Sequence, residues 1–192
     1  MMKIVWQPWE RFQYYAIFGV GEYSLSVPSA TVSNSLTGDS LGQLYGAGIK
    51  TSIVPDTIVA ASGFPTPAIS IDASILRSLY DFNRRFPGGT PGLNNNINQR
   101  LELMTYQFAV EGSHLFSLDE YWKLEPYGGV KWTRVQSDIK DLVDGSHAGG
   151  QQDTVAPFLG LRVPVGDHEA FFAEASFIDG YLYGAGLELR FK

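Results

Sequence analysis

A period-two alternation of apolar and polar residues runs through most of this 192-residue chain, and it constrains the fold more than any other feature. Successive side chains of a β-strand point to opposite faces, so this period indicates strands that separate two different environments. The stretch 181–191 is the clearest, because Leu187 and Phe191 lie on one face and Glu188 and Arg190 lie on the other. We therefore expect an all-β fold.

Eight stretches carry this alternation, and most of them have about ten residues or more. They are 13–27, 43–54, 67–78, 100–113, 120–136, 154–165, 171–177 and 181–191. Strands that cross a bilayer at a tilt need about 9–11 residues, whereas strands of soluble proteins usually have about five or six. The sequence therefore predicts an eight-stranded antiparallel up-and-down transmembrane β-barrel, in one domain that covers residues 1–192.

The connections between these stretches alternate in length. Residues 28–42, 79–99 and 137–153 are long and rich in Gly, Asn and Ser, whereas the other links are shorter on average. Bacterial outer-membrane barrels have long loops outside and short turns on the periplasmic side. Both termini are then expected on the periplasmic side.

Residues 1–12 are interpreted as a segment that precedes the first strand. Their aromatic residues Trp6, Trp9 and Phe12 predict a periplasmic or interfacial anchor, and docking of a periplasmic partner is the alternative. The start of the chain lacks the long apolar core of a signal peptide, so we expect that an exported protein has lost its signal before this numbering begins.

Alternation alone also fits a soluble β-barrel or sandwich. The types of residue on the two faces distinguish these folds from a membrane barrel. Charged residues make up only 18% of the chain, and the polar faces are rich in Gly, Ser and Ala, which suits a narrow lumen better than a solvated surface. Aromatic residues gather near the ends of the apolar faces, as expected for interfacial belts. They are Tyr23, Trp122, Trp132, Phe171, Phe177, Tyr181 and Phe191.

Three bulk properties exclude other classes of protein. The net charge of −6 argues against a broad nucleic-acid surface. The absence of cysteine removes disulfides and thiolate metal sites. No window of 18 apolar residues exists, so no transmembrane helix is expected.

If the apolar faces of the strands point outward, the charged residues on the other faces point into the lumen, and their acids and bases are nearly equal in number. The acids are Glu22, Asp72, Glu111, Glu125, Glu174 and Glu188, and the bases are Lys50, Lys123, Lys131, Arg162 and Arg190. An eight-stranded interior is only just wide enough for side chains, and an unpaired buried charge is very costly. We therefore predict a network of ion pairs that plugs the lumen. The alternative is that the pairs exchange partners and open a narrow water path.

Two groupings within this set are expected. Arg162, Glu174, Glu188 and Arg190 come from three consecutive strands and are predicted to form one cluster. Lys131 is predicted to pair with Glu111.

The last strand carries a short motif of its own. Gly186, Leu189 and Phe191 match the pattern of a glycine, two apolar residues separated by one, and an aromatic end. This resembles the C-terminal signal by which outer-membrane barrels are recognised for assembly. Two departures are Gly184 at the usual polar position and Lys192 after the aromatic.

With the strand count and loop plan, the chain resembles the OmpA/OmpX class of small barrels. The resemblance implies a bacterial outer membrane as location. It also implies membrane lipid, lipopolysaccharide and the barrel-assembly machinery as partners. It transfers no activity.

Candidate chemistry outside the lumen is sparse. His147 lies beside Ser146 and near Asp144 and Asp153, but residues this close in a Gly-rich loop rarely face each other as a catalytic site requires. The other histidines, His114 and His168, fall at predicted periplasmic turns. We expect no catalytic residue and no cofactor.

Two sets of loop residues remain as binding candidates. Asp138, Asp141, Asp144 and Asp153 lack the spacing of a calcium loop, so no metal site is predicted. Arg84 and Arg85, in a predicted outer loop, are candidates for contact with lipopolysaccharide phosphates, because arginine binds phosphate through two parallel hydrogen bonds.

The favoured hypothesis is a non-enzymatic outer-membrane barrel with a structural, adhesion or envelope-stability role and a plugged lumen. The alternatives are a narrow pore for small solutes and, third, a lipid-modifying enzyme.

Overall fold

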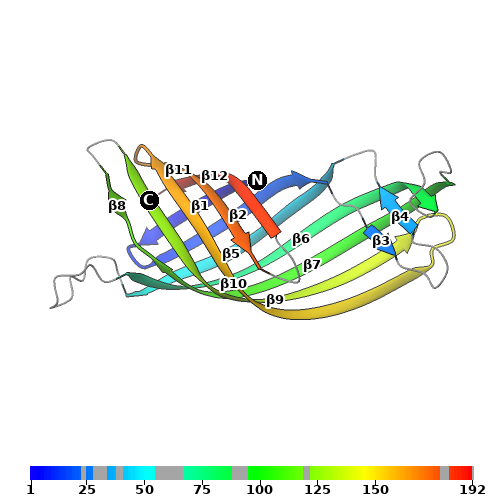
Figure 1. Cartoon of the computed structure of the whole chain (residues 1–192), viewed down its shortest axis with the longest axis horizontal. Helices are drawn as coiled ribbons and strands as arrows, with labels where there is room; N and C mark the ends of the chain where they lie inside the picture. Colours follow the sequence, from blue (N-terminus) through cyan, green and yellow to red (C-terminus); the bar gives the residue numbers. More distant parts are fainter. Residues whose placement is uncertain are drawn as a thin grey trace.

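The computed structural model describes residues 1–22, 25–27, 34–37, 41–54, 67–87, 95–118, 122–177 and 182–191. The side chains of 25–27, 34–37, 84–87, 95–96 and 182–183 are not described. All regular structure in the described residues is β-strand, which confirms the all-β expectation (Figure 1). No helix among the described residues has the length and apolar character needed to span a membrane.

Nine strands form a closed barrel, which we call the ring. They are β1 (Met2–Trp9), β2 (Phe12–Gly21), β5 (Gly42–Val54), β6 (Ala68–Pro87), β7 (Asn95–Ser113), β9 (Lys123–Asp141), β10 (His147–Val165), β11 (Glu169–Ser176) and β12 (Leu182–Phe191). Each pairs antiparallel with the next, and β1 pairs parallel with β12 to close the ring. The prediction of a barrel is confirmed, and the expected count of eight strands is corrected to nine.

The extra strand is β1, which the sequence analysis left outside the barrel. Met2 and Trp6 are exposed on its outer face, whereas Val5 is completely buried. Pro8 lies in the register shift between Trp6 and Trp9, where a residue without an N–H disrupts no ladder bond. With nine consecutive antiparallel strands, the first and the last run in the same direction, which explains the parallel pair.

Two of the predicted long loops consist largely of strand. β6 continues to Pro87 and β7 begins at Asn95, within the expected loop 79–99. β9 and β10 continue to Asp141 and His147, so only a tight turn joins them. In 147–153 of β10 both faces are exposed, so no apolar alternation indicates a strand there.

The predicted first strand, 13–27, is also shorter than expected, because β2 ends at Gly21. Two short strands follow, β3 (Leu25–Val27) and β4 (Asn34–Thr37), and β4 pairs with the end of β6. A further short strand, β8 (Phe116–Ser117), pairs with the beginning of β9.

The strands are strongly tilted in the barrel. A line of paired residues that starts at Val163 of β10 and crosses all nine strands returns to β10 at Gln151, twelve residues away. Such a stagger requires strands inclined by roughly 35–45° to the barrel axis. Figure 1 shows this inclination in the crossing of β10, β11 and β12 over β6 and β7 behind them.

The strands β6, β7, β9 and β10 extend beyond the ring, toward the right in Figure 1. We call this part the protruding sheet; it consists of 80–87 of β6, 95–103 of β7, 134–141 of β9 and 147–154 of β10. β11 pairs with β10 only from Phe158 onward, so no described strand continues the sheet beyond β10.

Candidate functional site

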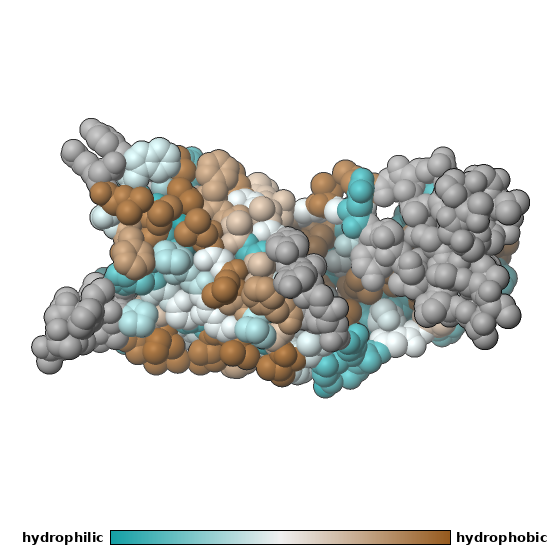
Figure 2. Space-filling model, viewed as in Figure 1, coloured by the Kyte–Doolittle hydropathy of each residue, from teal (hydrophilic) through white to brown (hydrophobic). Residues whose placement is uncertain are grey.

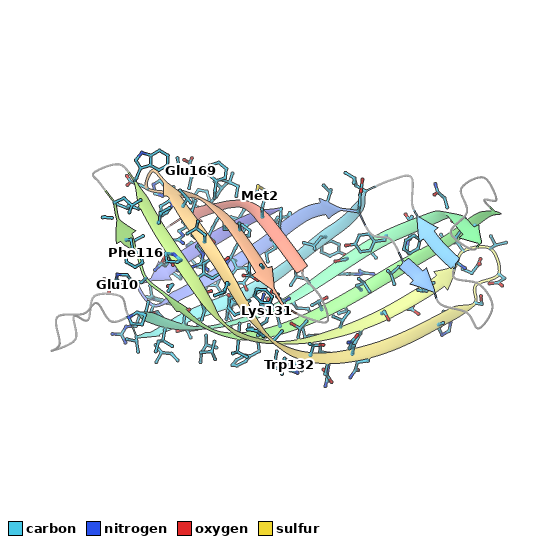
Figure 3. The ribbon with its side chains drawn as sticks, in the orientation of Figure 1. Met2, Glu10, Phe116, Lys131, Trp132 and Glu169 are labelled. Carbon is cyan, nitrogen blue, oxygen red and sulfur yellow. The ribbon has the colours of Figure 1, made fainter. Side chains whose placement is uncertain are left out.

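The outer face of the ring is apolar and exposed. Val130 of β9 and Leu159 of β10 expose 53% and 61% of their surface. In Figure 3, Lys131 and its neighbour Trp132 lie on opposite sides of the β9 ribbon. The predicted alternation is therefore confirmed with the apolar residues outward. Further exposed apolar side chains on this face are Phe18, Ile49, Ile75, Phe108, Val155 and Phe171.

This apolar band has a definite height. In β10 it runs from Val155 to Val165, and at about 3.3 Å per residue with a tilt of about 40° this span measures roughly 25 Å along the barrel axis. Exposed aromatic residues occur near one limit of the band, including Trp6, Trp9 and Phe191. Along the lower edge of Figure 2, brown apolar atoms give way to teal polar atoms toward the right.

Ion pairs mark the limit of the band next to the protruding sheet. Arg134 donates two hydrogen bonds to Asp153, at 2.7 and 2.9 Å, across the outer face of β9 and β10. These bonds hold the pKa of the Asp153 carboxyl below its usual value. Arg77–Glu102 and Arg100–Asp81 form equivalent outer pairs on β6 and β7, with N–O distances of 2.6 and 2.7 Å.

The interior of the ring centres on Arg162, which is only 6% exposed. Its guanidinium donates to both carboxylate oxygens of Glu111 at 3.1 Å and to Glu125 at 2.8 Å. Lys50 donates to the same Glu111 at 2.6 Å. Carboxylates from two other strands, β7 and β9, thus hold one buried cation from β10, which satisfies the requirement that buried charges be paired.

A second group of charges joins this centre. Glu188, which is 2% exposed, accepts a hydrogen bond from Arg190 at 2.5 Å and lies 3.6 Å from Lys3. Arg190 also lies 3.9 Å from Glu125. The alternating chain therefore runs across the lumen as Lys50, Glu111, Arg162, Glu125, Arg190, Glu188 and Lys3.

Two tyrosines support this chain by lying against glycines of the neighbouring strand. A Cβ at Gly48 would lie 2.3 Å from the Tyr15 ring, and one at Gly160 would lie 2.1 Å from the Tyr127 ring. The rings lie 4.0 Å from the Lys3 ammonium and the Arg162 guanidinium, respectively. Glycine at these positions lets each tyrosine lie along the wall and stabilise a cation.

The remaining strands contribute two further polar contacts. Tyr15 donates to Asp72 of β6 at 2.5 Å. Lys131 of β9 pairs with Glu174 of β11. Every strand of the ring therefore supplies at least one side chain to the interior network.

The structure brings together nine of the ten predicted network residues: Lys50, Asp72, Glu111, Glu125, Lys131, Arg162, Glu174, Glu188 and Arg190. Glu22 is not among them, because it is exposed and follows the end of β2. Lys123 is also exposed, at the start of β9.

The pairings differ from those expected. Lys131 pairs with Glu174 on the opposite side of its strand, and Glu111 is held by Lys50 and Arg162 instead. Glu174 is therefore separate from the Arg162 cluster. Alternation places these charged side chains on the inner face. Which of them form ion pairs depends on the stagger between strands and on how far each side chain extends across the lumen.

Lys3, Tyr15 and Tyr127 belong to the interior but were not predicted to take part in the network. Lys3 was missed because β1 was placed outside the barrel, although Met2, Lys3 and Ile4 already alternate. The tyrosines gave no signal of their own, since the facing glycines become apparent only when strands are paired.

The loop candidates have structural roles. Asp144 accepts a hydrogen bond from the Ser146 N–H at 2.7 Å within the β9–β10 turn, and hydrogen bonding to Ser146 lowers the pKa of its carboxyl. His147 begins β10 opposite Lys140, and His168 Nδ1 lies 3.1 Å from the Arg190 carbonyl oxygen. His114 stacks edge-on against Phe116. Within the described ranges, no group of three His, Asp or Glu side chains is arranged to hold a metal ion.

The predicted lipid-contact and assembly residues lie in strands. Arg84 and Arg85 belong to β6 and pair with β4 and β7, but their side chains lie outside the described part. Gly186, Leu189 and Phe191 lie on β12. A Cβ at Gly186 would lie 2.2 Å from the Met1 carbonyl oxygen, so glycine allows the start of β1 to approach β12.

These features define a closed antiparallel β-barrel with an apolar exterior and a charged interior. No family model, no curated protein and no solved structure matches the chain.

Proposed function

We propose that this protein is an integral membrane β-barrel of the bacterial outer membrane, with a plugged lumen and a non-enzymatic role. The observation that carries the proposal is the inverted polarity of the ring, in which large apolar side chains cover the outside and ion pairs fill the inside. Water outside would leave this apolar surface hydrated, whereas acyl chains would match it.

The dimensions of the outer face support this location. Its height of roughly 25 Å equals that of the apolar band of outer-membrane barrels. Closing the ring pairs β1 with β12, as required in a solvent that cannot hydrogen-bond an open edge. Bacterial barrels usually have an even number of strands. The outer membrane is therefore proposed from the terminal motif on β12 and the apolar band, and not from the strand count.

The interior network supports a plug in preference to a pore. Arg162, Glu111 and Glu188 are almost completely buried, and each of the nine strands supplies at least one side chain to the ion pairs and hydrogen bonds of the interior. Separating a buried pair leaves an uncompensated charge, which costs several kcal/mol. A water path through the ring would require several such separations at once.

Among the non-enzymatic roles, the protruding sheet favours adhesion. Residues 147–153 of β10 are exposed and pair with β9 on one side, and the described part of the chain places no strand on their other side. A strand of this kind presents main-chain donors and acceptors that can pair with an extended segment of another protein.

The location is tested by solubility and by gel mobility. The purified protein should require detergent and should migrate differently before and after boiling, because closed membrane barrels resist dodecyl sulfate until heated. Solubility without detergent would contradict the proposal.

The plug is tested in planar lipid bilayers. The wild-type protein should give no steps of conductance, whereas Arg162→Ala together with Glu111→Ala should give small steps, because the pair that bridges the lumen is removed. Steps in the wild type would favour a pore for small solutes.

The adhesion role is tested by display on a bacterium that lacks adhesins. Cells that display the wild type should attach to immobilised matrix proteins, and Ala148→Lys in β10 should reduce attachment because a charge at the edge opposes strand pairing. Gln136→Lys, on the inner strand β9, is the matched control. Equal attachment by cells without the protein would remove adhesion and leave a structural role.

A further inference from the structure

Two arginines lie where the outer face of the ring changes from apolar to charged. Arg77 follows the exposed Ile75 on the outer face of β6. Arg134 follows Trp132, which is labelled in Figure 3, on the outer face of β9. The arginine side chains are 40% and 39% exposed. Both cations therefore lie at the limit of the apolar band next to the protruding sheet.

The two arginines lie at nearly the same height on the barrel. Arg77 is opposite Met104 of β7, and Arg134 is opposite Tyr106, two residues away on the same strand. A stagger of twelve residues over nine strands shifts equal height by about 1.3 residues per strand. The offset of two residues across two strands runs in the direction of this shift and nearly matches it. From the spacing and rise of strands, the two Cα atoms are about 12 Å apart.

A carboxylate on the side of the protruding sheet holds each guanidinium. Arg134 donates through Nε and Nη2 to Asp153, and its guanidinium lies 5.4 Å from the Trp132 ring. Arg77 lies with its Nε 2.6 Å from Glu102. A guanidinium has five N–H donors, so these contacts orient each arginine while they occupy only part of it.

The level at which the arginines lie selects an anionic head group. The polar head groups of a bilayer begin where its hydrocarbon core ends, and their phosphates lie in that layer. Arginine binds phosphate through two parallel hydrogen bonds. Exposed ion pairs such as Arg134–Asp153 contribute little stability, so a phosphate can compete with the carboxylates for these guanidinium groups.

The spacing of the arginines favours one lipid. In the proposed orientation the protruding sheet is outside the cell, because it contains the long excursions of the chain beyond the ring, so the arginines face the outer leaflet. Lipid A, the membrane-embedded part of lipopolysaccharide in that leaflet, carries a phosphate on each of its two sugar rings, whereas a phospholipid carries one. Two cations at one height and about 12 Å apart fit a head group with two phosphates.

This level also distinguishes these arginines from the pair considered in the sequence. The backbone of Arg84 is seven residues further along β6 than that of Arg77, which corresponds to roughly 18 Å along the barrel axis. Phosphates at the limit of the apolar band are therefore closer to Arg77 than to Arg84 and Arg85.

We propose that Arg77 and Arg134 together bind the two phosphate groups of one lipid A molecule. The acyl chains of this lipid lie along the apolar outer face of the ring, against Ile75, Phe108 and Val130. This inference rests on the proposed outer-membrane location, because only there does the ring meet this lipid.

The test uses the full-length protein in dodecyl maltoside micelles with purified bisphosphorylated lipid A, and native mass spectrometry counts the lipid retained by each barrel. The wild type should retain one molecule. Arg77→Gln combined with Arg134→Gln should lower the retention about tenfold, because both charge-assisted contacts are lost. The wild type should retain less of a lipid A that lacks one phosphate, and less phosphatidylglycerol.

Arg100→Gln combined with Lys140→Gln is the matched control. It also removes two positive charges from exposed outer-face positions of neighbouring strands, but further out on the protruding sheet. This control should retain lipid A as the wild type does.

Three outcomes would overturn the inference: unchanged retention in the Arg77/Arg134 variant, equal losses in the two double variants, or equal retention of lipid A and phosphatidylglycerol by the wild type. If all three proteins still show the heat-dependent gel shift, such a failure concerns the arginine pair alone. A wild type without that shift would instead contradict the membrane barrel itself.

Discussion

The ring and the protruding sheet share four strands, yet their outer faces have opposite chemistry. Along β9, the outer face changes from Val130 and Trp132 to Arg134, Gln136 and Asp138 without any break in the strand. The backbone is equally regular in both parts, so its geometry does not cause the change. This change at one height fits the proposed location, in which lipid surrounds the ring and water surrounds the protruding sheet.

The inner face is charged in the ring and apolar in the protruding sheet, the reverse of the outer face. The ring encloses Arg162 and Glu111, whereas the inner face of the protruding sheet carries Phe82 and Leu101, which are 1% and 2% exposed. Ile139 of β9 packs against the same cluster. The ring thus has its apolar side outward, and the protruding sheet has its apolar side inward like a water-soluble sheet.

Removing the central buried cation is expected to have the largest effect. Arg162→Met leaves Glu111 and Glu125 without their main partner inside the ring. Loss of one member of a buried pair costs about 3–5 kcal/mol, so we expect the free energy of unfolding in urea, measured in lipid vesicles, to fall by that amount.

The matched control for this variant is Arg134→Met, which removes an arginine from an outer ion pair of the same barrel. Its effect should be much smaller and should shrink in high salt, because exposed pairs are screened. Equal effects at the two positions would contradict the distinction between a dry interior and a wet protruding sheet.

The second-largest effect is expected from introducing a charge on the outer face of the ring. Val130→Arg places a cation in the apolar band, where outer-membrane barrels lose about 2–4 kcal/mol near the bilayer midplane. Gln136→Arg makes the same change on the same face of β9, six residues further on and beyond the band. Unfolding in vesicles should show a large loss for the first variant and almost none for the second.

The turn of the protruding sheet is expected to give a smaller, local effect. Gly145 has a φ of 77°, in the left-handed region, so Gly145→Ala should cost about 1–2 kcal/mol. Amide hydrogen exchange should accelerate at the ends of β9 and β10 but not in the ring. Gly150→Ala, where the backbone is not left-handed, is the control, and an equal acceleration there would refute the explanation.

The smallest expected effect concerns the pH response of the outer pair. Hydrogen bonds from Arg134 lower the pKa of Asp153, so their contribution is present above the usual aspartate pKa and is lost as the pH falls through the lowered value. In Arg134→Met, the pKa of Asp153 should rise toward its usual value. A titration of this carboxyl by nuclear magnetic resonance measures the shift, and an unchanged pKa would show that the pair has no role in solution.

The sequence predicted the ring better than the protruding sheet for a physical reason. In the ring, one face of each strand is apolar and the other is polar or small, so the period of two is visible, as in 43–54 and 67–78. In 147–153 of β10, both faces are exposed and polar, so the strand looks like a loop. The same principle explains β1, whose short alternation was obscured by three aromatic residues that were interpreted as an anchor.

The sequence by itself determined which face of most ring strands is apolar and, for nine of the ten predicted network residues, which charges face the lumen, because both follow from the period of a strand. Only the tertiary structure decided that nine strands close the ring, that Lys131 meets Glu174, and that Lys3 belongs to the network. Those outcomes depend on the stagger between strands and on the width of the closed ring. A register shift moves a charge toward a different partner without changing the face on which it lies.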